Sequence, residues 1–364
     1  VKTADIMIAV TASDELNLLC CLIAQKTGHC QTIARVRNPI YSKEIGFIQE
    51  RLGLSMIINP ELATAREISR LLRFPAAIKI DPFSKGRVEL LKFKVLPEFK
   101  LDGMSVSQIS DAFRSDILVC AIESRDNVSI PGGDHIIHDG DMVSILASPL
   151  NAAAFFRKIG LKTNQVKNCI IVGGGTISYY LAHALLGMKI SVKIIEQNHE
   201  RCVELAELLP SAVIIEADGS RQDILAAECI SSTDAVITLT NMDEENLIIS
   251  MYASHIGVPK VITKVNRTEY VEAFKSMGID TFISPKALCS TDIVRYVRAM
   301  QNTTGGSVIT LHRMVEGKAE ALEFRASETT RHLGETLLDI QLKPEILIAC
   351  ITHKGRTIIP RGSD

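Results

Sequence analysis

The sequence predicts an α/β protein in which Rossmann-like domains with doubly wound parallel sheets alternate with small α+β domains. Three observations predict this class: short Ile- and Val-rich runs alternate with helical segments, a glycine-rich turn follows one such run, and the chain repeats itself. Aromatic residues make up 5% of the 364 residues and Trp is absent, whereas hydrophobic residues reach 46%. This composition suits buried parallel strands covered by helices.

The internal repeat predicts the order of the domains. Residues 5–17 (DIMIAVTASDELN) and 234–246 (DAVITLTNMDEEN) align without a gap at an offset of 229 residues. A smaller module repeats as well, because ILVCAI at 117–122 matches ILIACI at 346–351. We therefore expect two copies of a pair that consists of a larger and a smaller domain. The expected boundaries are 1–80 and 85–163 for the first pair, and 165–300 and 305–364 for the second.

The two copies differ in length. In the second copy 67 residues, 167–233, separate the small module from the repeated segment, whereas four residues precede that segment in the first copy. The stretch 134–147 follows Ile130-Pro131, but the sequence stops soon after the matching Ile359-Pro360. We expect the first large domain to lack its first half and the second small domain to lack its last strand. An edge left unpaired in this way favours association unless another chain covers it.

A dinucleotide-binding pattern stands at the start of the complete copy. An apolar run at 169–172, expected to be a buried strand, leads directly into GGGTIS at 173–178. A helical pattern at 177–186 and a second strand pattern at 191–195 follow, and the latter ends at Glu196. Strand, glycine turn, helix, strand and acid in this order predict a Rossmann-type nucleotide site.

Each position of this pattern has a physical role. Gly173 makes the tight turn, Gly175 lets the backbone approach phosphate, and the helix start presents free N–H groups to the anion. Ser178 stands where the third glycine of the pattern is expected. Glu196 would accept hydrogen bonds from ribose hydroxyls and repel a 2′-phosphate, which favours NAD(H) over its phosphorylated form. NAD(H) and ATP/ADP remain open alternatives, and so does a Rossmann-type domain without a ligand.

Further strand patterns complete the expected parallel sheet, at 212–216, 235–239, 261–265 and 282–283. Ligands of such sheets lie at the carboxyl ends of the strands. We therefore expect the site to include Asp218, Thr240, Asn241 and Lys264, with a plain turn as the alternative role for Asp218.

Together these features resemble the RCK (KTN) family. The resemblance rests on the repeat, on IVGGGTIS at 171–178, on TNMDEEN at 240–246 and on the Ile-Pro module. It implies a Rossmann-type N-subdomain that binds NAD(H) or ATP/ADP, followed by a small C-subdomain. It also implies a homo-oligomeric ring at the inner face of the cell membrane. The protein would then be a cytoplasmic, peripheral regulatory subunit of an integral membrane potassium-translocating subunit, and not an enzyme.

The resemblance also assigns roles to residues of both copies. In the second copy, Gly173, Gly174, Gly175, Thr176 and Ile177 would hold the phosphates, Glu196 the ribose and Asp218 the adenine edge, with Thr240 and Lys264 at the rim. In the first copy, Thr11 and Ala12 match the loop after the fourth strand. Arg35 and Arg37 match positions whose basic side chains approach nucleotide phosphates in relatives, although a solvated role for both is the alternative.

Other functions remain as alternatives or are disfavoured. An NAD-dependent oxidoreductase, and an RCK regulator of a potassium channel or of a cation/proton antiporter, are the alternatives. The net charge of −2 gives no electrostatic reason to expect nucleic acid. The cluster DHIIHDGD at 134–141 is interpreted as a hairpin turn and not as a metal site. No run reaches the roughly 18 apolar residues of a membrane span, so a membrane role would come through a partner.

Overall fold

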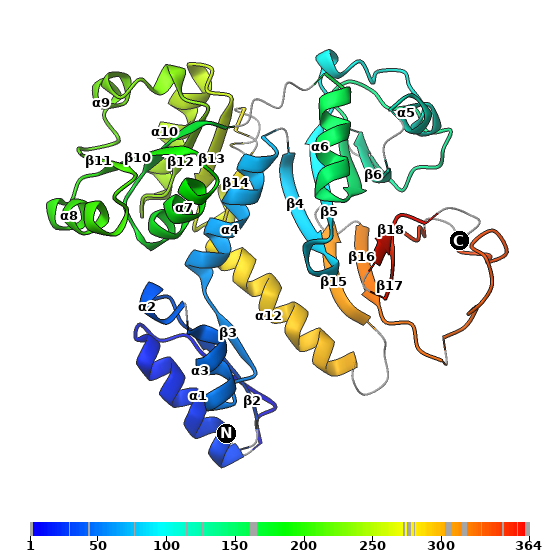
Figure 1. Cartoon of the computed structure of the whole chain (residues 1–364), viewed down its shortest axis with the longest axis horizontal. Helices are drawn as coiled ribbons and strands as arrows, with labels where there is room; N and C mark the ends of the chain where they lie inside the picture. Colours follow the sequence, from blue (N-terminus) through cyan, green and yellow to red (C-terminus); the bar gives the residue numbers. More distant parts are fainter. Residues whose placement is uncertain are drawn as a thin grey trace. The chain divides into compact units, whose positions relative to one another are not determined.

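The computed structural model of the chain divides into two compact units, which are described separately. The unit here called the parallel-sheet unit comprises Val1–Leu72 and Val166–Asp292, and the antiparallel-sheet unit comprises Arg73–Gln165 and Ile293–Asp364. Figure 1 labels the helices and strands of both. The structure describes residues 3–28, 30–42, 44–75, 77–113, 116–124, 127–160, 166–271, 274, 278–279, 281–302, 308–314, 319–328, 330–343, 346–354 and 356–360.

The second copy of the repeat forms a six-stranded sheet in the parallel-sheet unit. The strand order is β11-β10-β9-β12-β13-β14, and all five neighbouring pairs are parallel. The order reverses beside β9, which is the topological switch point of a doubly wound fold. The strands are β9 (Asn168–Val172), β10 (Ser191–Glu196), β11 (Val213–Glu216), β12 (Ala235–Thr238), β13 (Lys260–Lys264) and β14 (Phe282–Ile283). The helices are α7 (Thr176–Gly187), α8 (His199–Leu208), α9 (Gln222–Ala227), α10 (Asp243–His255) and α12 (Pro285–Asn302), whose residues from Ile293 onward belong to the antiparallel-sheet unit.

These strands form because β-branched side chains are buried on both faces of the sheet. Ile170, Val172, Ile195 and Val236 belong to one core cluster and are at most 2% exposed. The α/β class expected from the sequence is confirmed, and each of the six strand patterns lies within a residue or so of an observed strand.

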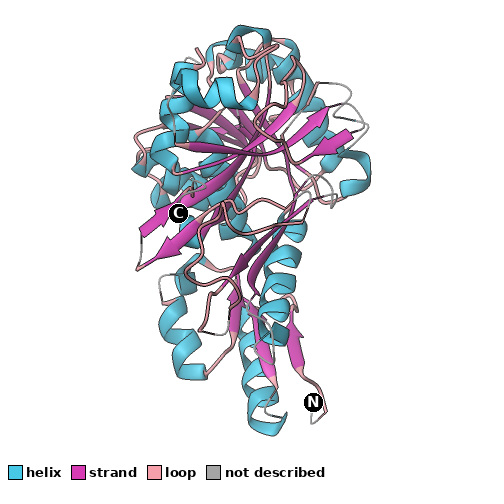
Figure 2. Ribbon diagram, turned by 90° about the vertical axis from the view of Figure 1, so that its right-hand side faces the viewer, coloured by secondary structure: helices cyan, strands magenta, loops and turns pink. Residues whose placement is uncertain are grey.

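The first copy contributes a three-stranded parallel sheet of order β1-β2-β3 to the same unit. Helix α1 packs on β1 and β2, where Cys21 and Ala24 are buried. Figure 2 shows strands and helices side by side near the N-terminus. The elements are β1 (Ile6–Ala9), α1 (Asp14–Gly28), β2 (Gln31–Arg35), α2 (Pro39–Ser42), α3 (Ile45–Leu52), β3 (Met56–Ile58) and α4 (Pro60–Arg73).

The antiparallel-sheet unit is built on a five-stranded sheet of order β4-β5-β8-β6-β7. Its core contains the fully buried rings of Phe93, Phe155 and Phe156, which contact one another at centroid distances of 5.2–6.3 Å. The strands of this sheet are β4 (Ala77–Phe83), β5 (Val88–Lys94), β6 (Ile117–Ser124), β7 (Asn127–Ser129) and β8 (Met142–Ala147). Two further antiparallel pairs are β15 (Val308–Met314) with β16 (Ala319–Phe324), and β17 (Ile351–His353) with β18 (Arg356–Ile358). The helices are α5 (Val106–Phe113) and α6 (Pro149–Lys158).

One local expectation is wrong in this unit, and one repeated segment differs in structure between the two copies. The predicted hairpin between Ile136-Ile137 and 142–146 does not form, because Ile136 makes an isolated bridge with Ser105 and β8 pairs with β5 and β6. The apolar run before Ile351 is not a strand in the second small module. Ile137 is buried, but Ile136, Ile346 and Leu347 are 49%, 54% and 39% exposed, so an apolar run alone does not make a strand without a partner strand beside it.

The nine free cysteines differ in their exposure to solvent, since Cys169 is buried and Cys229 is exposed. Burial raises the pKa of the Cys169 thiol to about 12, which keeps it protonated and unreactive. Over the described part of the chain, none of the helices has the length and hydropathy to cross a bilayer.

Candidate functional site: a glycine-turn cavity and its counterpart in the first copy

The glycine turn joins β9 to α7 in the parallel-sheet unit. Gly173 has a φ of 98°, and a Cβ there would lie 3.0 Å from the backbone of Leu239 and Thr240. A Cβ on Gly174 would lie 2.8 Å from Leu205 and 3.0 Å from Glu196. Gly173 therefore needs glycine for its conformation and for close approach to backbone, whereas a Cβ on Gly174 would require the Leu205 and Glu196 side chains to move.

Gly175 is the N-cap of α7, with a φ of −67° and open space where a Cβ would point. No side chain caps this helix, so its first-turn N–H groups are free to bind an anion. Ser178, in the place of the third glycine, is fully buried, and its hydroxyl donates to the Gly173 carbonyl at 2.5 Å. The serine thus ties the helix to the turn.

Glu196, at the end of β10, already holds the turn through its carboxylate. Oε2 accepts from Gly174 N–H at 2.6 Å, and Oε1 accepts from Asn198 N–H at 2.8 Å. A carboxylate offers about four acceptor positions, so lone pairs remain for sugar hydroxyls. Arg201, which the sequence pattern did not predict at the site, donates from Nε to the Gly174 carbonyl at 2.6 Å and forms an ion pair with Glu204. Its position in the first turn of α8, the helix that follows Glu196, was the sequence signal that could have identified it.

A cavity of about 390 Å³ lies over this turn. The cavity lies at the carboxyl ends of β9, β10, β11 and β12, as expected for a ligand site in a doubly wound sheet. Seven of the residues expected at the site line this cavity: Gly173, Gly174, Gly175, Glu196, Asp218, Thr240 and Asn241. Arg201 and Ser220 line it as well. Thr176 instead lines a neighbouring cavity, and Ile177 is buried behind the turn.

Asp218 and Lys264 have local hydrogen-bond partners. Asp218 accepts from the hydroxyl of Ser220 at 2.7 Å and from its N–H at 2.9 Å, and these bonds lower the pKa of Asp218. This is the turn role that the sequence left open. Lys264 is 7% exposed and donates to the Thr240 carbonyl at 3.0 Å. Burial lowers the pKa of Lys264, against the opposing attraction of Asp243 and Glu61.

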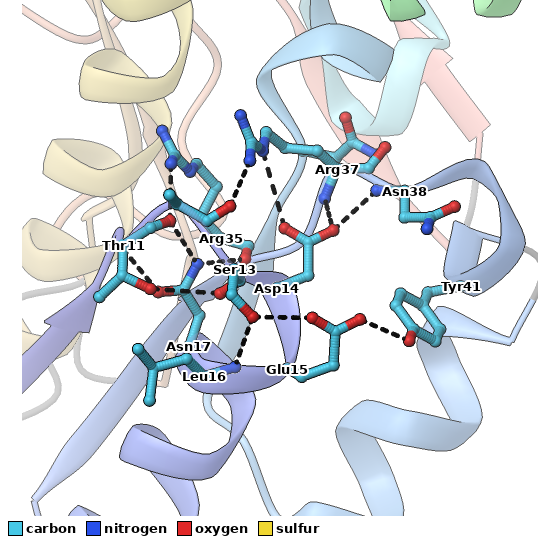
Figure 3. Close-up of polar contacts among 12 residues, drawn as sticks. Thr11, Ser13, Asp14, Glu15, Leu16, Asn17, Arg35, Arg37, Asn38 and Tyr41 are labelled. Carbon is cyan, nitrogen blue, oxygen red and sulfur yellow. Dashed lines mark hydrogen bonds and ion pairs between the residues drawn. The ribbon is translucent and has the colours of Figure 1, made fainter.

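An asparagine organises the loop after the fourth strand in both copies. Asn246 accepts from Thr240 N–H at 2.9 Å and donates to the carbonyls of Thr240 and Lys264, both at 3.1 Å. Asn17 does the same in the first copy with Thr11 and Arg35 at 2.6–3.2 Å (Figure 3). These side chains are bound to the backbone and act as structural residues.

An aspartate at the start of the next helix repeats as well. Asp14 accepts from the N–H groups of Arg37 and Asn38, both at 2.8 Å (Figure 3). Asp243 accepts in the same way from Asn266 and Arg267 at 2.9 Å. The repeat seen in sequence is therefore also a repeat of hydrogen-bond geometry.

The first-copy arginines are not merely solvated. Arg35 donates to the Thr11 carbonyl at 2.8 Å, which is the bond that Lys264 makes to Thr240. Arg37 donates to the Ala12 carbonyl at 2.6 Å. Thr11, Ala12, Arg35 and Arg37 lie outside the glycine-turn cavity.

A second cavity, of about 480 Å³, lies between the first and second copies within the parallel-sheet unit. Glu61 lines it, and burial raises the pKa of this carboxyl group, with Arg37 and Arg35 acting in the opposite direction. The described residues include no group of His, Cys, Asp and Glu arranged to hold a metal ion. The residues that line this second cavity include Arg37, Asn38, Glu61, Thr176, Tyr179, Arg201 and Glu204.

Solved structures share this architecture. The GsuK channel superimposes with a TM-score of 0.63 at 16% identity, over 99% of this chain and 62% of that chain. The GsuK channel bound to NAD gives a TM-score of 0.61 at 17% identity, over 99% of this chain and 62% of that chain. The parallel sheets, the glycine turn and the antiparallel sheet therefore give this chain a fold shared with the GsuK RCK domain.

Sequence comparisons identify the family within that class. The TrkA-N domain model matches residues 1–60 and 169–285. The Trk system potassium uptake protein TrkA homolog 1 of Methanosarcina mazei is 31% identical over 369 residues, covering 99% of this chain and 81% of the relative. TrkA of Halomonas elongata is 31% identical, covering 98% of this chain and 78% of the relative. The chain belongs to the family of the Trk system potassium uptake protein TrkA and its homologues.

Proposed function

We propose that this protein is a regulatory subunit of a potassium uptake transporter and binds NAD(H), or ATP/ADP at the same site, in the glycine-turn cavity. The observation that carries the proposal is the uncapped start of α7 beside a cavity that also contains Glu196. Free N–H groups at a helix start attract phosphate, and a carboxylate at the end of the second strand accepts from ribose.

The names of the relatives support a membrane transport protein as the partner of this chain. They are potassium uptake proteins, and one structural neighbour is a channel bound to NAD. We propose that the chain assembles as a homo-oligomeric ring on an integral membrane potassium-translocating subunit, at the cytoplasmic face of the membrane. Nucleotide binding changes the partner's state only through different affinities for two ring conformations.

The oxidoreductase alternative is not favoured by the relatives, which are transport proteins. Purified protein would decide it by NADH consumption with a panel of carbonyl substrates. Turnover there would contradict a purely regulatory role.

Titration calorimetry tests the proposed ligand. NADH, NAD, ATP, ADP and NADPH are titrated into the wild type and into Glu196→Ala. We expect NADPH to bind most weakly to the wild type, because its 2′-phosphate meets the carboxylate. We expect Glu196→Ala to bind NADH about tenfold more weakly, the effect of one lost charged hydrogen bond. Absence of heat with every adenosine compound, or preferential binding of NADPH, contradicts the proposal.

A further inference from the structure

Tyr180 connects the nucleotide-binding helix to the first copy. It lies on α7 and is 8% exposed. Its hydroxyl donates to the Arg37 carbonyl at 3.0 Å and accepts from Asn59 Nδ2 at 3.2 Å. Both partners belong to the first copy, so this hydroxyl joins the two copies inside the parallel-sheet unit.

The two partners occupy fixed points of the first copy. The N–H of Arg37 donates to Asp14, the first residue of α1. Asn59 precedes α4 and accepts from Leu62 N–H at 2.8 Å, which caps that helix. A displacement of the Tyr180 hydroxyl therefore acts on the starts of both α1 and α4.

The position of Tyr180 on α7 links it to the glycine-turn cavity. Thr176, one helical turn before Tyr180, is the first residue of the helix whose start faces the proposed phosphates. At the other end of α7, Ser69 of α4 donates a hydrogen bond to the sulfur of Met188 at 3.8 Å. Contacts near both ends of α7 make the helix a rigid connection between the turn and α4.

The surroundings leave room for a second arrangement. The cavity of about 480 Å³ lies beside the contact and is lined by Arg37, Thr176 and Tyr179. In the described structure, Glu61 Oε2 is buried there without a hydrogen-bond partner, and Asp14 Oδ1 has only a long ion pair, 3.7 Å from Arg37 Nε. Buried polar atoms without partners are costly, so a small shift that satisfies them is energetically accessible.

We propose that Tyr180 is the positioning residue through which a nucleotide bound at the glycine turn changes the first copy. This inference rests on the proposed function, since it requires a ligand at that turn. Binding at the start of α7 shifts the helix, the hydroxyl carries the shift to Arg37 and Asn59, and the first turns of α1 and α4 respond. The coupling is a free energy shared by the ligand and the contact, so it is measurable from either end.

Amide hydrogen exchange with and without NADH tests this, in the wild type, Tyr180→Phe and Tyr179→Phe. The Tyr180→Phe variant retains the buried ring and loses only the hydroxyl, and Tyr179→Phe removes a hydroxyl one residue away. We expect NADH to change exchange at Arg37, Asn38 and Leu62 about fivefold in the wild type and in Tyr179→Phe, a typical coupling. In Tyr180→Phe this change falls below about twofold, while the change at the start of α7 is retained.

Calorimetry on the same samples separates the possible failures. If NADH binds the wild type but leaves exchange in the first copy unchanged, the inference is wrong and the proposed function stands. The inference is equally wrong if Tyr180→Phe transmits the change undiminished. If the wild type gives no heat with NADH or any other adenosine compound, the proposed function fails and the inference fails with it.

Discussion

The two copies of the repeat build the same loop in different surroundings. Asn17 and Asn246 hold equivalent loops, and Arg35 and Lys264 donate to equivalent carbonyls. The sheets differ, because β12 pairs with both β9 and β13, whereas β1 pairs with β2. Ile237 of β12 is fully buried, while the matching Ile8 of β1 is 43% exposed. The same loop geometry thus occurs in both copies, but only the second-copy loop lines the cavity over the glycine turn.

The largest expected effect comes from the turn itself. Gly173→Ala places a Cβ 3.0 Å from backbone at a φ of 98°, so we expect the free energy of unfolding to fall by about 3 kcal/mol or more. Gly175→Ala is the matched control, because its Cβ would meet open space at a φ of −67°. Urea unfolding measures both, and equal stability of the two variants contradicts the assignment of strain to Gly173.

Much of this turn was predictable, because its requirements are local. The apolar run before Gly173 and the acid at Glu196 fix a strand, a turn and a second strand at set spacings. Arg201 and Tyr180 were missed because their roles depend on neighbours distant in sequence, namely the Gly174 carbonyl and the first copy. The hairpin expected around Ile136 does not form because strand pairing also depends on segments distant in sequence: β8 pairs with β5 and β6.

The next largest effect tests the equivalence of the two loops. Asn17→Ala and Asn246→Ala each remove three hydrogen bonds to the backbone from a fully buried position. We expect each to lower the free energy of unfolding by about 2–3 kcal/mol. Only Asn246→Ala is expected to weaken NADH binding, because Thr240 lines the glycine-turn cavity. Equal losses of NADH affinity in the two variants would show that both loops bind ligand.

A smaller effect concerns the basic residue beneath each loop. Because burial lowers the pKa of Lys264 below its ordinary value of 10.5, the unfolded state binds more protons than the folded state just below that pH. The contribution of Lys264 to stability therefore rises as the pH increases from its lowered pKa towards 10.5, and is least favourable at lower pH. Lys264→Gln should lose this rise in unfolding titrations. A variant that keeps the wild-type slope would contradict the burial of a charged amine.

The most direct test is the number of NADH molecules bound per chain, measured by titration calorimetry. We expect one molecule per chain, bound with unchanged affinity in Arg35→Gln and more weakly in Glu196→Ala, because Glu196 lines the glycine-turn cavity and Arg35 does not. Two molecules per chain would reveal a second site and contradict the assignment of a single site. One molecule that is lost in Arg35→Gln while Glu196→Ala binds normally would place the site in the first copy and contradict it as well.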